Sequence, residues 1–222
     1  MSELPSMTAT AINTELIRRY ATEDTILQQA RVAATTAGLP TIEISPLQGK
    51  LLQVLAAACS ARKILEIGAL GGYSGIWIAR ALPTDGKLIT LEISPKHAEV
   101  VRANFALAGL TDRTEVRVGA ALDILPSLGT EAPFDLIFID ADKANYPGYL
   151  DWALQYSRIG TIIVADNVIR MGRPFQPDIS DPDTRGLATY NDRIASEPRL
   201  LSVAFPMDDD GLDGFGVSVV IK

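Results

Sequence analysis

Residues 63–79 have the sequence KILEIGALGGYSGIWIA, and this stretch decides the fold. The apolar run over 63–67 predicts a buried strand, the glycines at 68–72 predict a turn, and the apolar spacing from Tyr73 onward predicts a helix. Glycine adopts positive φ without steric cost, so a ligand can lie directly against such a turn. The stretch therefore predicts a cofactor cradle, and the alternative is a tight strand-to-helix turn that binds nothing.

The spacing of the glycines indicates which cofactor this would be. A dinucleotide fingerprint needs Gly-x-Gly-x-x-Gly, but counted from Gly68 the chain has Leu70 and Tyr73 where the second and third glycines should stand. Instead, Glu66 precedes the turn, and the next predicted strand closes on Glu92, where folds of this kind hold ribose hydroxyls. Two carboxylates without an anchored phosphate site favour a nucleoside whose other end is cationic. S-adenosylmethionine fits that description.

Length and composition set further limits. The 222 residues allow one large α/β domain, and no linker, charge run or repeat divides them. We therefore expect a single domain over 1–222, with an N-terminal helical cover at 1–43. The formal net charge of -7 argues against a nucleic-acid partner, because binding a polyanion requires clustered Lys and Arg.

Membrane and export signals are not expected either. No apolar run approaches the roughly 18 residues of a membrane helix, and residues 1–5 lack the basic and apolar regions of a signal peptide. The single cysteine, Cys59, excludes an intrachain disulfide. It lies in an Ala-rich helical stretch, so we interpret it as a core residue rather than a nucleophile. These features predict a cytoplasmic protein without a membrane partner.

Strands and helices alternate along most of the chain, which predicts a doubly wound parallel sheet. Two further strands close the chain, and the acidic loop between them is too short for a helix, so we expect a partly antiparallel edge. The predicted strands are 63–67, 87–92, 114–118, 134–139, 161–165, 200–206 and 214–221, and the predicted helices lie within 1–40 and at 46–58, from 73, 95–108, 121–128 and 147–158.

Two segments fall outside this alternation. The helices within 1–40 precede the first strand, so they could cover the site, contact another subunit or simply pack against the sheet. Residues 171–186 are rich in Pro, Asp and Gly. We expect a long connection there, of the kind that often binds ligands.

Ligands of open parallel sheets bind beyond the carboxyl ends of the strands. Asp140 follows the fourth predicted strand, and Asp166 and Asn167 follow the fifth. Hard oxygen donors without His or Cys favour Mg²⁺ or Ca²⁺, although Asp and Asn also favour helix caps and turns. Lys143 is close enough to Asp140 to face the same ligand and act as a general base. The alternative for Lys143 is a solvated surface lysine.

Four segments, in order and at similar separations, resemble segments of the cation-dependent O-methyltransferases, the group that contains the catechol and caffeoyl-CoA enzymes and many bacterial relatives. They are ISPLQG at 44–49, LEIGALGGYS at 65–74, IDADK at 139–143 and ADNV at 165–168. The Asp-Ala-Asp-Lys form is that of the bacterial and caffeoyl-CoA branches. Animal catechol enzymes have His and Trp in the middle two places, a difference that weighs against catechol itself as the acceptor.

The resemblance implies a Rossmann-like class I methyltransferase fold, a mainly parallel seven-stranded sheet and a homodimer. It also implies residue roles: Lys143 as the catalytic base, metal ligands at Asp140, Asp166 and Asn167, and cofactor contacts at Ile44, Glu66, Gly68, Ser74, Glu92, Ala121 and Asp140.

The expected function is methyl transfer from S-adenosylmethionine to a hydroxyl of a catechol-like aromatic small molecule. A vicinal diol would chelate the cation, Mg²⁺ being favoured because it readily keeps positions open for substrate. The alternatives are an NAD(P)-dependent oxidoreductase on a similar sheet and a non-catalytic S-adenosylmethionine-binding protein.

Overall fold

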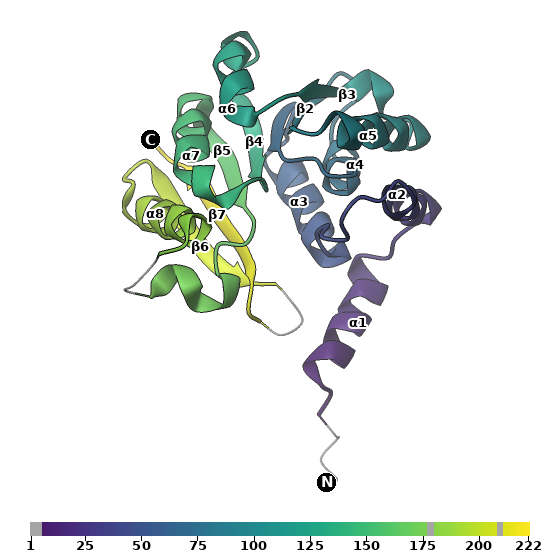
Figure 1. Ribbon diagram of the computed structural model, residues 1–222, viewed down its shortest axis with the longest axis horizontal. Coiled ribbons are helices and arrows are strands. Elements are labelled where there is room, and N and C mark those ends of the chain that lie inside the picture. Colours follow the sequence, from purple (N-terminus) through teal and green to yellow (C-terminus); the bar gives the residue numbers. More distant parts are fainter. Residues whose placement is uncertain (1–5, 177–179, 208–210) are drawn as a thin grey trace.

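The computed structural model describes residues 6–176, 180–207 and 211–222. Its seven strands form one sheet in the order β3-β2-β1-β4-β5-β7-β6 (Figure 1). Strands β1 to β5 pair in parallel, and β7 runs antiparallel to both β5 and β6. This confirms the mainly parallel sheet with an antiparallel edge. The strands are β1 Lys63–Ile67, β2 Lys87–Glu92, β3 Thr114–Val118, β4 Phe134–Ile139, β5 Ser157–Ala165, β6 Leu200–Pro206 and β7 Gly214–Val220.

Helices cover both faces of the sheet, because alternate side chains of the buried strands point to opposite sides. In β1, Ile64 packs into one apolar cluster, whereas Leu65 and Ile67 pack into the other. The first cluster lies under α2 Thr25–Thr36, α3 Pro46–Ala58, α4 Tyr73–Ala79 and α5 Pro95–Leu107. The second lies under α6 Ala121–Ile124, α7 Tyr146–Gln155 and α8 Pro182–Ser196.

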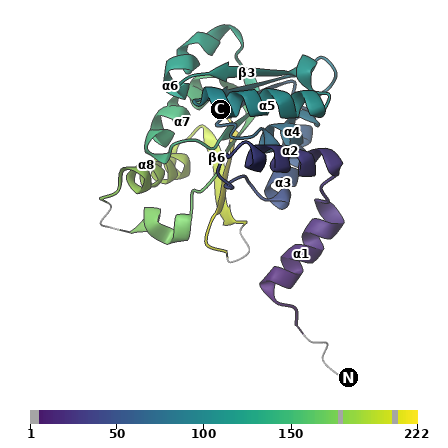
Figure 2. The same ribbon diagram turned by 45° about the vertical axis from the view of Figure 1, so that its right-hand side comes forward.

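The N-terminal helices behave differently from one another. Leu27 and Ala30 of α2 are buried in the first cluster. Helix α1, Ala9–Tyr20, has no buried residue. It contacts α3, and in both views it extends away from the sheet (Figures 1 and 2). The helical cover expected at 1–43 therefore contains one helix that packs on the core, α2, and one that is exposed, α1. None of the described helices is long and apolar enough to cross a membrane.

Several predicted boundaries are wrong, and the largest differences have local reasons. The helix expected at 147–158 ends at Gln155, because Ser157 already pairs with Phe134 of β4 and the register shifts before Leu136. Strand β5 thus begins before residue 161. The helix expected at 121–128 changes to a 3₁₀ helix at Leu125. Pro126 lacks the N–H that an α-helix would need there.

The connection expected at 171–186 is wrong at its end, where α8 begins at Pro182. The Asp181 carboxylate caps this helix by accepting the Thr184 N–H at 2.9 Å, and Pro182 occupies the first helical position. A short 3₁₀ helix, η4 Arg170–Phe175, starts the connection. Residues 177–179 within it, 208–210 of the acidic loop and 1–5 of the N-terminus lie outside the described residues.

Candidate active site

A cavity of about 870 Å³ opens beyond the carboxyl ends of the parallel strands. The turn after β1 and the end of β2 form part of its wall, and the segments after β4 and β5 form another part. Eight of the residues singled out from the sequence line it: Ile44, Gly68, Ser74, Glu92, Ala121, Asp140, Lys143 and Asn167. Glu66 and Asp166 are buried beside these lining residues.

The glycine turn packs directly against the metal-candidate loop. Gly68 has φ 98°, and a Cβ at this position would collide with the backbone carbonyl of Asp140. The Asp140 N–H donates to the Ile67 carbonyl at 2.8 Å, and the Gly68 N–H donates to the Leu91 carbonyl at 2.9 Å. Gly68 is therefore required by the contact between two strand ends, in addition to any ligand that lies on the turn.

Glu92 holds the same turn from the β2 side. One carboxylate oxygen accepts the Leu70 N–H at 2.9 Å and the Ala69 N–H at 3.3 Å, and the other accepts the Ser94 N–H at 2.9 Å. His97 Nδ1 lies 3.4 Å from that second oxygen. Because an ionised carboxylate has about four lone-pair sites, Glu92 keeps capacity for a ligand hydroxyl in the cavity that it lines.

Glu66 does not line the cavity, whereas Ser74, to which it is hydrogen-bonded, does. The Glu66 side chain is fully buried, and its carboxylate accepts a hydrogen bond from the Ser74 hydroxyl at 2.6 Å. Burial raises the pKa of Glu66 to about 7. The structure therefore places Glu66 behind the cavity wall, with Ser74 between it and the open space.

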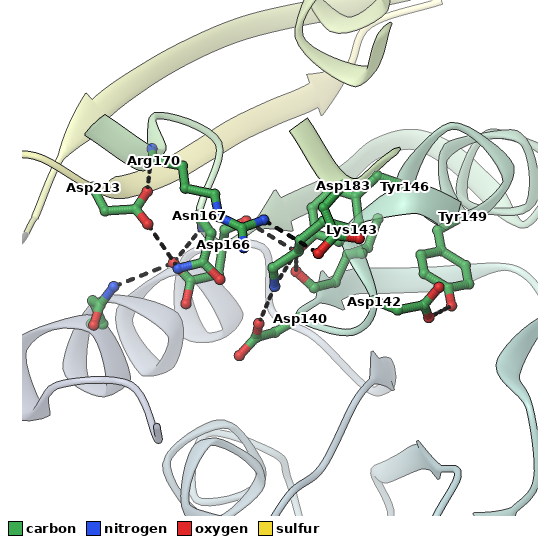
Figure 3. A network of polar contacts seen from close by, with 12 residues as sticks. Asp140, Asp142, Lys143, Tyr146, Tyr149, Asp166, Asn167, Arg170, Asp183 and Asp213 are labelled. Carbon is green, nitrogen blue, oxygen red and sulfur yellow. Dashed lines mark hydrogen bonds and ion pairs between the residues drawn. The ribbon is translucent and has the colours of Figure 1, made fainter. Parts of the chain in front are cut away.

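Lys143 is held in place by Asp140, which follows β4, and by Tyr146 at the start of α7 (Figure 3). Its ammonium donates to Asp140 at 2.7 Å and to the Tyr146 hydroxyl at 2.9 Å. It also lies 5.0 Å from the centre of the Tyr146 ring. The Lys143 side chain is only 13% exposed. This lysine is thus oriented within the site rather than solvated on the surface.

The Asp166 and Asn167 pair lies in a bend after β5 (Figure 3). One oxygen of Asp166 accepts the Asn167 N–H at 2.7 Å and the Gln48 amide at 3.5 Å. Burial, followed by the charge of nearby Asp140, raises the pKa of Asp166 well above its usual range. Asn167 has φ 58°, a left-handed conformation that asparagine tolerates better than most residues.

Several polar residues of the site were missed from the sequence. Asp213 lines the cavity and accepts hydrogen bonds from the Asn167 side chain at 3.0 Å and from the Arg170 N–H at 2.9 Å. The Arg170 guanidinium lies 3.6 Å from Asp183 of α8. Asp213 directly precedes β7, which pairs with β5. A prediction of this strand order would therefore have placed Asp213 near Asn167. Asp183 lies on α8, a helix that was not predicted from the sequence. The pairing of Arg170 with Asp183 could therefore not be predicted either.

The donor set at the strand ends fits a hard dication. Two carboxylates and one amide supply only oxygen atoms, which Mg²⁺ prefers. Asp166 is a carboxylate that is only 6% exposed and lies beside a second acid, an arrangement that a bound cation would stabilise. Among the described residues, no three His, Cys, Asp or Glu side chains gather as a metal-binding group. The Asn167 amide could supply the third oxygen of a three-ligand set.

Comparisons with known proteins agree on one family. A family model described as O-methyltransferase matches residues 18–213. A catechol O-methyltransferase from Niastella koreensis is 53% identical over 196 residues, covering 86% of this chain and 89% of that protein. A catechol O-methyltransferase from Mycobacterium tuberculosis is 45% identical over 199 residues, covering 89% and 90%. The crystal structure of an O-methyltransferase from Bacillus cereus in complex with SAH has 45% identity and a TM-score of 0.90, covering 95% of this chain and 97% of that one.

Proposed function

Because this chain belongs to the O-methyltransferase family, we propose that it transfers the methyl group of S-adenosylmethionine to one hydroxyl of a catechol-like aromatic diol, with a divalent cation in the site. Its membership makes it an S-adenosylmethionine-dependent O-methyltransferase. The NAD(P)-dependent oxidoreductase and the non-catalytic binding protein, which the sequence left open, are therefore no longer needed as alternatives.

The glycine turn and its surroundings support the cofactor assignment. The related Bacillus cereus enzyme was crystallised with SAH, the product that remains when S-adenosylmethionine has lost its methyl group. In this chain, Gly68, Ser74, Glu92 and Ala121 line one continuous cavity. We assign Glu92 to the ribose hydroxyls, since its carboxylate is fixed by the turn and retains free lone pairs.

Asp140, Asp166 and Asn167 would hold the cation. When bound, a divalent ion would supply positive charge that lowers the pKa of an acceptor hydroxyl and favours the phenolate. Asp140 and Asn167 line the cavity from two neighbouring strand ends. The acceptor diol would then lie against this wall, beside the cofactor turn that lines the same cavity.

Lys143 would accept the acceptor hydroxyl's proton. Only the neutral amine form of Lys143 can accept a proton. The Tyr146 hydroxyl, 2.9 Å away, holds the Lys143 nitrogen at a fixed place beside the cavity. The resulting phenolate oxygen would attack the sulfonium methyl in line, forming the C–O bond as the C–S bond breaks. Since no covalent intermediate with the protein is needed, positioning and charge placement supply the acceleration.

One observation carries the proposal: a single cavity is lined by the glycine turn, by Asp140 and Lys143, and by Asn167. This arrangement would bring a methyl donor and a cation-held acceptor into contact. Because both groups of residues line the same cavity, transfer between them would require no domain movement.

Methyl transfer from labelled S-adenosylmethionine to a panel of aromatic diols tests the proposal, with Mg²⁺ and with EDTA. We expect cofactor binding in both conditions, measured by calorimetry, and transfer only with Mg²⁺. Asp166→Ala should bind the cofactor and lose transfer. Undiminished turnover in EDTA, or full activity of Asp166→Ala, would contradict the metal role while leaving the family assignment intact.

The homodimer implied by the resemblance stays a proposal. Ile12, Leu16 and Tyr20 of α1 are exposed apolar side chains on a helix with no buried residue. A second copy of the chain would remove such side chains from water. Light scattering of the purified protein tests this, and a monomer at micromolar concentration would contradict it.

A further inference from the structure

The Asn167 side chain has one fixed orientation. Its amide nitrogen lies 3.0 Å from a carboxylate oxygen of Asp213 (Figure 3). A carboxylate only accepts hydrogen bonds, so the NH₂ group of Asn167 must face Asp213 and the amide oxygen must face away from it. This contact therefore decides which atom of Asn167 is available as a cation ligand.

Asp213 is itself anchored by backbone donors. The oxygen that does not contact Asn167 accepts the Arg170 N–H at 2.9 Å and the Gly214 N–H at 2.8 Å. Gly214 begins β7, which pairs with β5 up to Ala165, two residues before Asn167. The carboxylate is thus fixed by the same strand pairing that places Asn167, and it does not depend on a flexible side-chain partner.

We propose that Asp213 is a positioning residue, which holds the Asn167 amide so that its oxygen faces the divalent cation. The inference rests on the proposed metal role of Asn167. Groups that hydrogen-bond to metal ligands fix ligand orientation, and their loss typically lowers metal affinity by about 10- to 100-fold. Asp213 also carries a negative charge close to the site, so the test must separate orientation from charge.

Asp213→Asn separates them, because it changes little in shape but replaces one acceptor oxygen with a donor. The remaining oxygen can keep the Arg170 and Gly214 N–H groups, which leaves the new NH₂ facing Asn167. The Asn167 amide must then turn its own oxygen toward position 213 and present NH₂ to the cation. We expect Mn²⁺ affinity, measured by the EPR signal of free Mn²⁺, to fall about 10-fold or more, with unchanged affinity for S-adenosylmethionine.

Asp123→Asn is the charge-matched control, since Asp123 lines the same cavity from α6. It should change Mn²⁺ affinity by less than about twofold. A loss caused by charge alone would shrink in about 0.5 M KCl, where screening is strong. A loss caused by the turned amide would persist.

A rescue variant tests the remaining alternative, that Asp213 only holds its own loop in place. Combining Asp213→Asn with Asn167→Asp places a symmetric carboxylate at the ligand position and a donor behind it, so Mn²⁺ affinity should return to within a few-fold of the parent. If Asp213 serves only the loop, the double variant will stay as weak as Asp213→Asn, and the inference is overturned.

Asn167→Ala distinguishes a failure of the metal-ligand role of Asn167 from a failure of the positioning role of Asp213. If Asn167→Ala weakens Mn²⁺ binding but Asp213→Asn does not, the positioning role is wrong and the metal site stands. If Asn167→Ala binds Mn²⁺ as tightly as the parent, the proposed metal ligand is wrong and the role of Asp213 fails with it.

Discussion

Gly186 of α8 packs against the backbone of Lys143 and Ala144 so closely that no side chain fits between them. A Cβ at position 186 would overlap the Lys143 carbonyl oxygen and lie 2.8 Å from the Ala144 Cα. The helix that the sequence analysis missed is therefore the support against which the candidate base rests. This contact connects α8, far along the chain, to the candidate site residues that follow β4.

Gly186→Ala should displace the Lys143 segment. Overpacking costs about 1–3 kcal/mol, and the better helix propensity of alanine offsets only about 1 kcal/mol of it. We expect a lower Tm and a fall in kcat of at least about tenfold, because small misplacements of reacting groups are costly. Gly129→Ala is the matched control, since nothing lies within 4 Å of the added methyl. Equal kcat in both variants would contradict the support role.

Lys143→Ala should remove the base without removing the cofactor site. General-base catalysis contributes about 10²- to 10⁴-fold, so kcat should fall within that range while affinity for S-adenosylmethionine stays unchanged. Raising the pH should recover part of the lost rate, because the acceptor then ionises without help. Lys50→Ala on α3, outside the cavity, controls for the loss of a lysine. A variant at position 143 with full kcat would exclude the proposed base.

Tyr146→Phe should loosen Lys143 while keeping the ring that packs in the core. The hydroxyl contacts the Lys143 ammonium at 2.9 Å and the Asp166 carbonyl at 3.0 Å, and it is fully buried. Its loss should cost about 1–3 kcal/mol of unfolding free energy, seen in urea denaturation, and lower kcat more than it changes KM. Tyr190→Phe, which removes another buried tyrosine hydroxyl from the same cluster, provides the comparison.

Glu66 should make stability fall as pH rises. Burial raises its pKa in the folded protein to about 7, from 4.5, so the folded state binds the proton more tightly than the unfolded state. The resulting stabilisation is complete below about pH 4.5 and is lost as the pH rises through about 7. The shift corresponds to about 3 kcal/mol. Glu66→Gln should remove this decline between pH 5 and 8 in urea titrations, and parallel curves for both proteins would refute it.

Much of the fold follows from local patterns, because buried parallel strands are apolar runs with clear ends. The predicted bounds of β1, β3 and β4 agree with the structure, and Ser45 caps α3 as expected. The β5 boundary was wrong because pairing with β4 overrides the helical spacing up to residue 158. Helix α8 was not predicted, because its many polar residues obscure the helical spacing of its buried apolar side chains, which include Leu187, Tyr190 and Ile194.

The candidate site could be located from the sequence, but its internal contacts could not. Strand-end rules place Asp140, Asp166 and Asn167 at one edge of the sheet. They do not reveal that Ser74 stands between Glu66 and the cavity, or that Asp213 faces Asn167. Those relationships depend on the order of β5 and β7 and on side-chain orientation, which residue spacing does not encode.

The backbone contact between Gly68 and Asp140 has a practical consequence for engineering. Because main-chain atoms set the separation between the glycine turn and the loop after β4, exchanging an exposed side chain that lines the cavity, such as Ile42, should leave that separation unaltered. We therefore expect libraries that diversify only such positions to change which acceptor binds while keeping the spacing between the turn and the loop.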